Sequence, residues 1–376
     1  MNKQELVRNL INIPGWRTRR HLVVFESDDW GSIRIPSREV YEILLSSGLP
    51  VDEHYFTKND CLESNDDLEL LFEVLTSRRD RKGNHPVITA NAVVANPDFD
   101  KIKAAGFSAY HYELIGETYK SYPNHSGVMK LWLNHGIGQK LLWPQFHGRE
   151  HLNVSSWLRS LNTGVRSEKL AFSHKAILGM PVPGEPVQPY NYMAAFEYLS
   201  ESHKKEIELI ALSGLELFEK VFGFQSRSFV ASCSIQGEHL DPVIKEGGVL
   251  YHQCGQQYRP LGNGRVRIIN KLWGQKNKSG QTYWRRNCLF EPSRKPEFDW
   301  AGHCMKDINI AFRWGKPAVI NSHRVNYSGG IFESNRDNSL VQLKQLIDGI
   351  LKRWPDAEFI TSEDLGNIMT GVEKTL

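Results

Sequence analysis

Short runs of β-branched and aromatic residues recur along this chain, and a polar loop and a helix-like stretch follow most of them. The runs lie at 21–25, 86–91, 140–146, 228–231, 249–252, 288–290, 317–322 and 358–361. Helical spacing of apolar residues occurs at 37–46, 65–76, 151–160, 194–222 and 339–353. This alternation predicts an α/β fold with a parallel sheet, either closed as a barrel of seven or eight βα units or open and doubly wound.

The composition excludes several classes of protein. The chain has 376 residues, 40% of them hydrophobic and 24% charged, as in ordinary globular proteins. Because 46 Lys and Arg nearly balance 43 Asp and Glu, no strong basic field indicates a nucleic-acid partner. The longest apolar runs are too short for a membrane span, and residues 1–20 lack the apolar core of a secretory signal, so we expect a cytoplasmic protein.

We expect residues 1–376 to form a single catalytic domain, because no repeat or long Gly/Ser linker divides the chain. Insertions are predicted near 97–139, 161–195 and 255–286. The cysteines are odd in number and contain no CxxC pair, so neither a disulfide framework nor a thiolate zinc site is expected. The sequence does not indicate the oligomeric state.

Three polar clusters directly follow predicted strands, at the ends where α/β proteins place their chemistry. They are Asp28 with Asp29, His147 with His151, and His323. If a helix begins at His147, the two histidines lie on one face of it, and one carboxylate from another strand would complete a His2Asp set for a zinc-like ion. The neighbouring carboxylate would then accept a proton from a bound water.

Each cluster by itself has a simpler explanation. In a chain with 14 histidines an HxxxH pair arises easily by chance, and a single histidine such as His323 is more often structural. Adjacent aspartates also cap helices, as we expect for Asp66 and Asp67. The indication of a metal site comes from the occurrence of all three clusters at strand ends.

Four segments resemble motifs of the polysaccharide deacetylase family (carbohydrate esterase family 4, NodB homology). Residues 25–31, FESDDWG, resemble its first motif, TFDDG, and residues 147–151, HGREH, resemble its second motif, HxxxH. Residues 320–323, INSH, are similar to its last motif, and residues 359–362 are similar to the strand that follows. The order and approximate spacing agree, and the resemblance extends from residue 21 to about residue 365.

The resemblance implies a deformed (β/α) barrel and metal-dependent removal of an N- or O-acetyl group from a sugar. It makes Asp28 the general base, His323 the general acid, and Asp29, His147 and His151 the ligands of a divalent ion, first of all Zn2+, with Co2+, Mn2+ or Ni2+ as alternatives. A backbone N–H near Cys233 or Ser234 would stabilise the oxyanion.

Two family motifs differ in this chain. The third normally reads like RPPYG, but residues 229–234 contain no arginine or proline, and Arg227 stands at the start of that strand. The fourth motif matches Asp299 and Trp300 only loosely. No role follows from the sequence for residues 284–286, WRR.

Further residues near predicted strand ends are candidates for substrate binding. Aromatic rings suit the apolar faces of sugars, although most aromatic residues simply pack in the core. The basic stretch 259–278 is expected to be a solvated insertion or, alternatively, to bind an anionic glycan. The substrate-binding candidates are Trp30, Asn91, Trp143, Cys233 and Ser234.

The sequence therefore supports three hypotheses. The first is a metal-dependent deacetylase that acts on a carbohydrate or glycan precursor. The second keeps the fold but hydrolyses another non-peptide amide, because the third-motif arginine is missing. The third is a non-catalytic carbohydrate-binding protein with a vestigial metal site, which the retained ligand residues disfavour.

Overall fold

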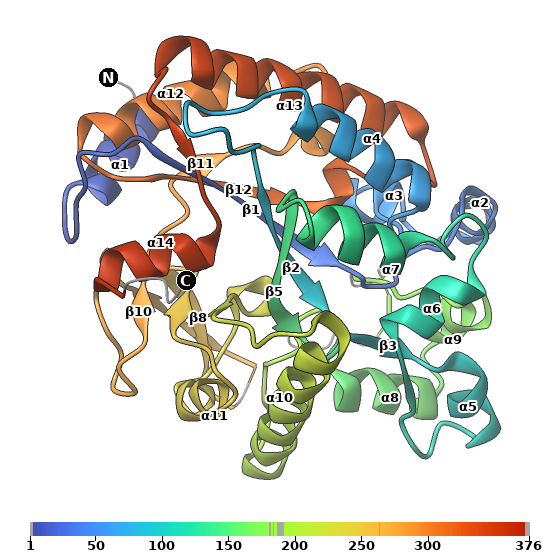
Figure 1. The fold of residues 1–376 in the computed structure, drawn as a ribbon. Coiled ribbons are helices and arrows are strands. Elements are labelled where there is room, and N and C mark those ends of the chain that lie inside the picture. Colours follow the sequence, from blue (N-terminus) through green and yellow to red (C-terminus); the bar gives the residue numbers. More distant parts are fainter. Residues whose placement is uncertain (1–2, 180–181, 183, 186–191, 263, 373–376) are drawn as a thin grey trace.

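A curled sheet of nine parallel strands forms the centre of the computed structural model, which describes residues 3–179, 182, 184–185, 192–262 and 264–372 (Figure 1). The strand order is β10-β7-β6-β5-β2-β1-β12-β11. The last strand, β13, pairs with Leu22 and Val23 at the start of β1, and β2 pairs with β1 from Phe25 onward. The strands are β1 (Leu22–Trp30), β2 (Ile88–Val93), β5 (Leu142–Gly148), β6 (Ser228–Phe229), β7 (Tyr251–His252), β10 (Thr282–Tyr283), β11 (Cys288–Leu289), β12 (Ala318–His323) and β13 (Glu358–Phe359).

This arrangement confirms the α/β class and the deformed (β/α) barrel. The alternative fold, an open doubly wound sheet, is excluded. Among the described residues β10 and β11, the end strands of the path, do not pair with each other, so the barrel is not closed by hydrogen bonds. All ladder pairs of the sheet are parallel, so the carboxyl ends of the strands meet at one rim. That rim carries the polar clusters.

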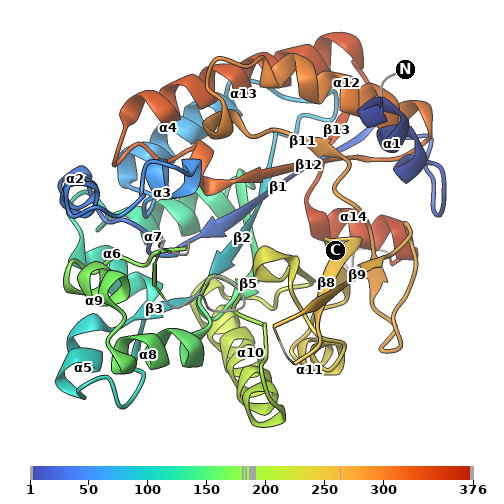
Figure 2. The same cartoon turned by 180° about the vertical axis from the view of Figure 1, so that it is seen from behind.

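Helices cover the outside of the curled sheet. In both views α4, α12 and α13 run along one side, and α10 and α11 lie on the opposite side (Figure 2). The α-helices are α1 (Lys3–Asn12), α2 (Arg38–Ser46), α3 (Tyr55–Asn59), α4 (Asn65–Thr76), α5 (Phe99–Ala104), α6 (Ile115–Ser121), α7 (Val128–Leu131), α8 (Val154–Thr163), α9 (Arg166–Ser173), α10 (Glu201–Phe222), α11 (Leu240–Glu246), α12 (Trp300–Arg313), α13 (Glu333–Arg353) and α14 (Ser362–Thr370). A short π-helix, Trp132–Ile137, follows α7.

Two short antiparallel ribbons stand outside the main sheet. One joins β3 (Ala95–Pro97) to β4 (Tyr112–Leu114), and the other joins β8 (Gln256–Pro260) to β9 (Val266–Asn270). The second ribbon lies in the predicted insertion 255–286, and much of β9 is exposed, as expected for its basic stretch. Among the described residues, no helix is both long enough and apolar enough to cross a bilayer.

Local capping explains where several helices begin. Ser64 and Asp67 form a reciprocal capping box at α4, so the Asp66–Asp67 pair does stand at a helix N-terminus, as predicted. The helix predicted at 194–222 begins only at Glu201, because the Ser200 side chain caps it, and it ends at Gly223 in a left-handed conformation. The helix predicted at 151–160 begins at Val154 behind the Asn153 cap, and that predicted at 339–353 already begins at Glu333.

We expect Gly366→Ala to destabilise the protein, although alanine normally favours a helix. A Cβ at Gly366, in α14, would lie 2.3 Å from the buried ring of Tyr251, so the helix must shift at a cost of ~1–3 kcal/mol. Urea unfolding measures the loss. Gly349→Ala in α13 is the matched control, because its Cβ would meet only the flexible Met305 side chain at 3.3 Å. Equal stability of the two variants would contradict the packing described here.

Candidate active site

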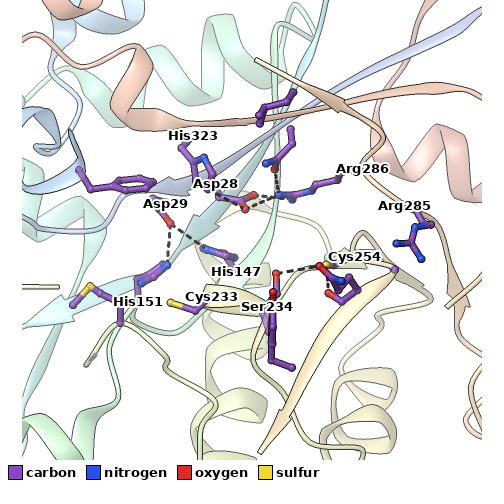
Figure 3. Close-up of a pocket in the computed structure, with 18 of the residues that line it drawn as sticks. Asp28, Asp29, His147, His151, Cys233, Ser234, Cys254, Arg285, Arg286 and His323 are labelled. Atoms are coloured by element: carbon purple, nitrogen blue, oxygen red, sulfur yellow. Dashed lines mark hydrogen bonds and ion pairs between the residues drawn. The ribbon is translucent and has the colours of Figure 1, made fainter. Parts of the chain in front are cut away.

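Asp29, His147 and His151 form a buried cluster at the carboxyl rim of the sheet (Figure 3). Asp29 Oδ1 lies 2.9 Å from His151 Nε2 and 3.3 Å from His147 Nε2. One ligand atom from each residue falls within 4.8 Å of the others. The structure therefore brings together the three residues that the sequence motifs indicated as metal ligands.

The two histidines do not share a helix face, so that part of the sequence interpretation is wrong. His147 belongs to β5, and His151 lies in the bend before α8 begins at Val154. The chain turns at Gly148, where φ is +152°, and this turn brings the imidazole rings to a centroid distance of 4.9 Å. A strand end and a bend, instead of one helical turn, create the pair.

The hydrogen bonding of His147 leaves room for a cation ligand between these groups. His147 Nδ1 lies 2.8 Å from the Val230 carbonyl oxygen, which only accepts, so Nδ1 carries the proton and Nε2 presents a lone pair. Nε2 is buried without a hydrogen-bond partner among the described residues, and the atom that it faces, Asp29 Oδ1, is an acceptor as well. A divalent ion would satisfy both lone pairs, so the nitrogen and oxygen donors fit a zinc-like metal.

Burial and charge keep the cluster in a form that can bind a metal. Burial lowers the pKa of His151 to about 4 despite the Asp29 carboxylate, so the imidazole is neutral at neutral pH. Burial would raise the pKa of Asp29, but the two histidines and Arg34 outweigh it and lower that pKa well below its usual range. Asp29 also has a φ of +77°, a left-handed conformation that costs energy for a residue with a Cβ.

A second layer of buried charges holds the strained end of β1. The guanidinium of Arg324, which is fully buried, donates to Asp60 Oδ1 at 2.9 Å, to Glu63 Oε2 at 3.1 Å and to the Ser32 carbonyl at 2.7 Å. Arg34 bridges Asp60 Oδ2 at 3.3 Å and Asp29 Oδ2 at 3.5 Å. Sequence reasoning did not identify these residues, because nothing local marks an ion pair between distant segments.

Asp28 points away from this cluster and binds Arg286 through two parallel hydrogen bonds. Arg286 Nη1 lies 2.7 Å from Asp28 Oδ2, and Nη2 lies 2.8 Å from Oδ1. The remaining donors of the guanidinium bind Glu26 Oε2 at 2.7 Å, Asn321 Oδ1 at 2.7 Å and Gln253 Oε1 at 3.0 Å. Every N–H of this arginine therefore has an acceptor, which fixes its position.

Arg286 is the functional residue that the sequence interpretation missed. Its guanidinium lies beside Asp28, the candidate base. The third family motif normally contains an arginine, and the matching segment of this chain has none. Arg227, the arginine just before β6 at the start of the third-motif strand, instead donates to the Gly248 carbonyl. Burial would raise the pKa of Asp28, but Arg286 outweighs it and lowers that pKa to about 2. Arg286 follows β10, a strand of only two residues that left no signal in the sequence.

His323 stands on the other side of Asp28, with its Nε2 3.9 Å from Asp28 Oδ2. Its Nδ1 lies 2.6 Å from Glu291 Oε2, and Asn326 donates to the other oxygen of Glu291 at 2.7 Å. Burial would lower the pKa of His323, but Glu291 outweighs it and, with Asp28, raises that pKa to about 9. The imidazole is therefore a cation at neutral pH.

The loose fourth-motif match is wrong. Asp299 caps α12 by accepting from Gly302 N at 2.7 Å, and Trp300 packs in the hydrophobic core. The carboxylate beside His323 belongs instead to Glu291. No sequence signal distinguishes Glu291 from other glutamates, because its partner is 32 residues away in the chain.

A cavity of about 1220 Å3 opens over these groups, and only some of the predicted substrate contacts are among its lining residues. Trp30 is fully buried, with its ring stacked on Tyr327. Trp143 lies near the other end of β5 and donates to Glu363 at 3.1 Å, and neither tryptophan is among the described residues that line the cavity. Asn91 is also fully buried and donates to Asp28 Oδ1 at 2.7 Å, which makes it a support for the carboxylate.

Cys233 and Ser234, which the sequence indicated as substrate contacts, line the cavity. Both have a positive φ, of 55° and 56°. The Ser234 N–H is already bonded to the Ala231 carbonyl at 2.8 Å, so it does not point at an oxyanion. The aromatic rings that line the cavity belong instead to Phe56, at the start of α3, and Tyr258, in β8.

No protein-family model and no curated protein sequence matches this chain. Among solved structures, the chain aligns with a protein of Mycobacterium smegmatis described as a polysaccharide deacetylase, at 12% identity and a TM-score of 0.44, over 96% of each chain. A protein of Pseudomonas aeruginosa PAO1 described as a polysaccharide deacetylase aligns at 9% identity and a TM-score of 0.43, over 94% of this chain and 93% of that one. A protein of Parabacteroides distasonis described as a glycoside hydrolase/deacetylase aligns at 8% identity and a TM-score of 0.47, over 97% of this chain and 73% of that one.

We expect the purified protein to bind about one zinc ion per chain through this cluster. His151→Ala should weaken zinc binding by more than the roughly 10–100-fold that loss of a supporting hydrogen bond costs, because it removes a ligand. Competition with a chromophoric chelator measures the affinity. His135→Ala, which removes an exposed imidazole elsewhere, should bind zinc like the wild type. Unchanged affinity in His151→Ala would exclude the cluster as the metal site.

Proposed function

We propose that this protein is a metal-dependent hydrolase that removes an N- or O-acetyl group from a carbohydrate or glycan precursor. One observation carries the proposal: an ionised carboxylate, Asp28, lines the same cavity as the candidate metal cluster and a protonated imidazole, His323, whose Nε2 lies 3.9 Å from Asp28 Oδ2. Hydrolysis of an acyl group needs a proton acceptor for water and a proton donor for the leaving group, and both are present. The sequence motifs of polysaccharide deacetylases place the same residue types in the same order.

Asp29, His147 and His151 would hold the metal ion. A divalent ion bound there supplies Lewis-acid polarisation of a carbonyl oxygen and lowers the pKa of a water molecule. Asp29 and Asp28 divide the work because the left-handed backbone at Asp29, with φ of +77°, turns its carboxylate toward other neighbours than those of Asp28. One carboxylate is thus committed to the ion, and the other remains available for a proton.

Asp28 is the proposed proton acceptor, and Arg286 and Asn91 are its supports. The bidentate pair with Arg286 keeps Asp28 ionised and holds it in one orientation, which removes the cost of arranging it during the reaction. His323 is the proposed donor of a proton to the leaving amine or alcohol. Glu291 orients its ring and keeps it charged, so the site enters the reaction with the base deprotonated and the acid protonated.

The cavity suits a saccharide. Its volume, about 1220 Å3, exceeds the roughly 300–1,000 Å3 of pockets that take drug-sized molecules, which leaves room for more than one sugar unit. Phe56 and Tyr258 offer ring faces against which the apolar side of a sugar can pack. Hydrolysis of another non-peptide amide is the second candidate, because the arginine and the acid-supporting carboxylate come from segments outside the family motifs.

Asp28→Asn is expected to abolish acetate release from acetylated sugars, by about 100–10,000-fold, while the zinc content stays that of the wild type. Enzymatic detection of acetate and elemental analysis give the two readouts. Asp66→Asn, at an exposed helix N-terminus, serves as the matched control and should keep both. Loss of zinc in Asp28→Asn and not in Asp29→Asn would reverse the two roles.

The wild type itself separates the candidate functions. Zinc-loaded protein that releases no acetate but hydrolyses other linear or cyclic amides would support the second candidate. Protein that binds sugars, retains no metal and gains no activity with Zn2+ or Co2+ would be a carbohydrate-binding protein. Both outcomes contradict the proposed deacetylase.

The acid role of His323 predicts a specific pH dependence. The charged groups facing His323 are Glu291, Asp28 and Asp29, and the imidazole can donate a proton only below its pKa of about 9. Acetate release should therefore fall as the pH rises through about 9. Glu291→Gln removes the carboxylate that raises this pKa, so the fall should move to lower pH. Glu297→Gln, at an exposed position, should leave it unchanged, and an identical alkaline limb in all three proteins would refute the role.

A further inference from the structure

The arginines that line the cavity differ in their partners. Arg8 pairs with Asp307 at 2.9 Å, Arg34 lies 3.5 Å from Asp29 Oδ2, and Arg286 pairs with Asp28. The carboxylates that line the cavity are those same three aspartates, so each already has an arginine. Arg285, the fourth arginine of the lining, forms no ion pair with any carboxylate of the described residues.

The guanidinium of Arg285 is held in place by neutral groups. Its Nη1 donates to the Lys271 carbonyl at 3.1 Å, and its Nη2 lies 3.4 Å from Asn270 Oδ1. Gly255 makes room for its aliphatic part, since a Cβ at Gly255 would lie 2.4 Å from Arg285 Cγ. The side chain is only partly exposed, and burial lowers its pKa because no carboxylate compensates the charge. The protein thus keeps an oriented positive charge in the cavity wall without a counter-ion.

Arg285 is separated from the metal cluster. Figure 3 shows it beyond Arg286 and Asp28, on the side of Cys254, whereas Asp29 and His151 stand at the opposite side of the view. Gln256, Tyr258 and Asn270 of the β8–β9 ribbon also line the cavity. A ligand group at Arg285 would therefore belong to a part of the substrate other than the acyl group that is cleaved.

We propose that Arg285 binds an anionic group of the substrate, a carboxylate or a phosphate, so that the protein acts on a negatively charged acylated saccharide. The inference rests on the proposed function and names its substrate class. An arginine fork matches two oxygens of either anion, and a partly buried, oriented guanidinium loses less entropy on binding than a free side chain. The same anion would neutralise the charge that the cavity wall leaves uncompensated.

Sugar binding tests this without any catalytic turnover. The dissociation constants of glucose, glucuronate and glucose 6-phosphate are measured by NMR titration at low ionic strength. Wild-type protein should bind at least one of the two charged sugars about tenfold more tightly than glucose, with the difference shrinking as salt increases. A preference for glucuronate assigns a carboxylate, and one for glucose 6-phosphate assigns a phosphate.

Substitutions connect the preference to this residue. Arg285→Gln should bind all three sugars equally, and Arg285→Lys should retain part of the preference because it keeps the charge. Arg79→Gln is the matched control, since Arg79 likewise donates to a backbone carbonyl, that of Gly83, but is exposed outside the cavity. Equal binding of the three sugars by the wild type, or a preference that survives in Arg285→Gln, would overturn the proposal.

The sugar-binding preference tests the anion site separately from the proposed deacetylation. A protein that prefers charged sugars through Arg285 but releases no acetate would keep the anion site and refute the deacetylase. A protein that releases acetate from neutral sugars and shows no preference for charged sugars would support the deacetylase and refute the anion site. Unfolding curves of the variants exclude misfolding as the cause of a lost preference.

Discussion

Two adjacent aspartates at the end of β1 turn toward different neighbours, and the rest of the site depends on this divergence. Asp28 faces Arg286, which binds both of its oxygens, and Asp29 faces His147 and His151. Successive side chains of a strand point to opposite sides, and the positive φ of Asp29 turns its carboxylate into the cluster. One strand end thus supplies a carboxylate to the candidate metal cluster and another to the proposed proton acceptor.

Such a concentration of charge is stable only because the charges are paired. Arg324 lies fully buried between Asp60 and Glu63, and Arg286 uses all its donors on five acceptor atoms. Removal of one member of such a pair leaves an uncompensated buried charge, which typically costs ~3–5 kcal/mol. The hydrogen bonds of Arg286 also join β1 to β12 and to the segment after β10, so they hold the site together and fix the position of Asp28.

The alternation of strands and helices and the polar residues at strand ends could be predicted from the sequence, because both depend on short-range patterns. Trp30 shows where such patterns mislead: it stands next to the two aspartates, yet its indole points into the core and stacks on Tyr327. Position beside a strand end does not determine the direction of a side chain. The HxxxH pair was predicted to be helical and is formed by a strand and a bend instead. The residues that gather into the cluster were therefore identified from the sequence, and their local structure was not.

Residue order therefore determines the parallel α/β framework, the metal-binding residue types and the two candidate proton carriers, since these are encoded in local periodicity and short motifs. The partners that tune those groups depend on chain segments brought together by folding. Arg286 is 258 residues from Asp28, and Glu291 reaches His323 only because β11 and β12 run side by side. The physical reason is that the attraction between a carboxylate and a guanidinium depends on their distance in space. The number of residues between them in the chain does not reveal that distance.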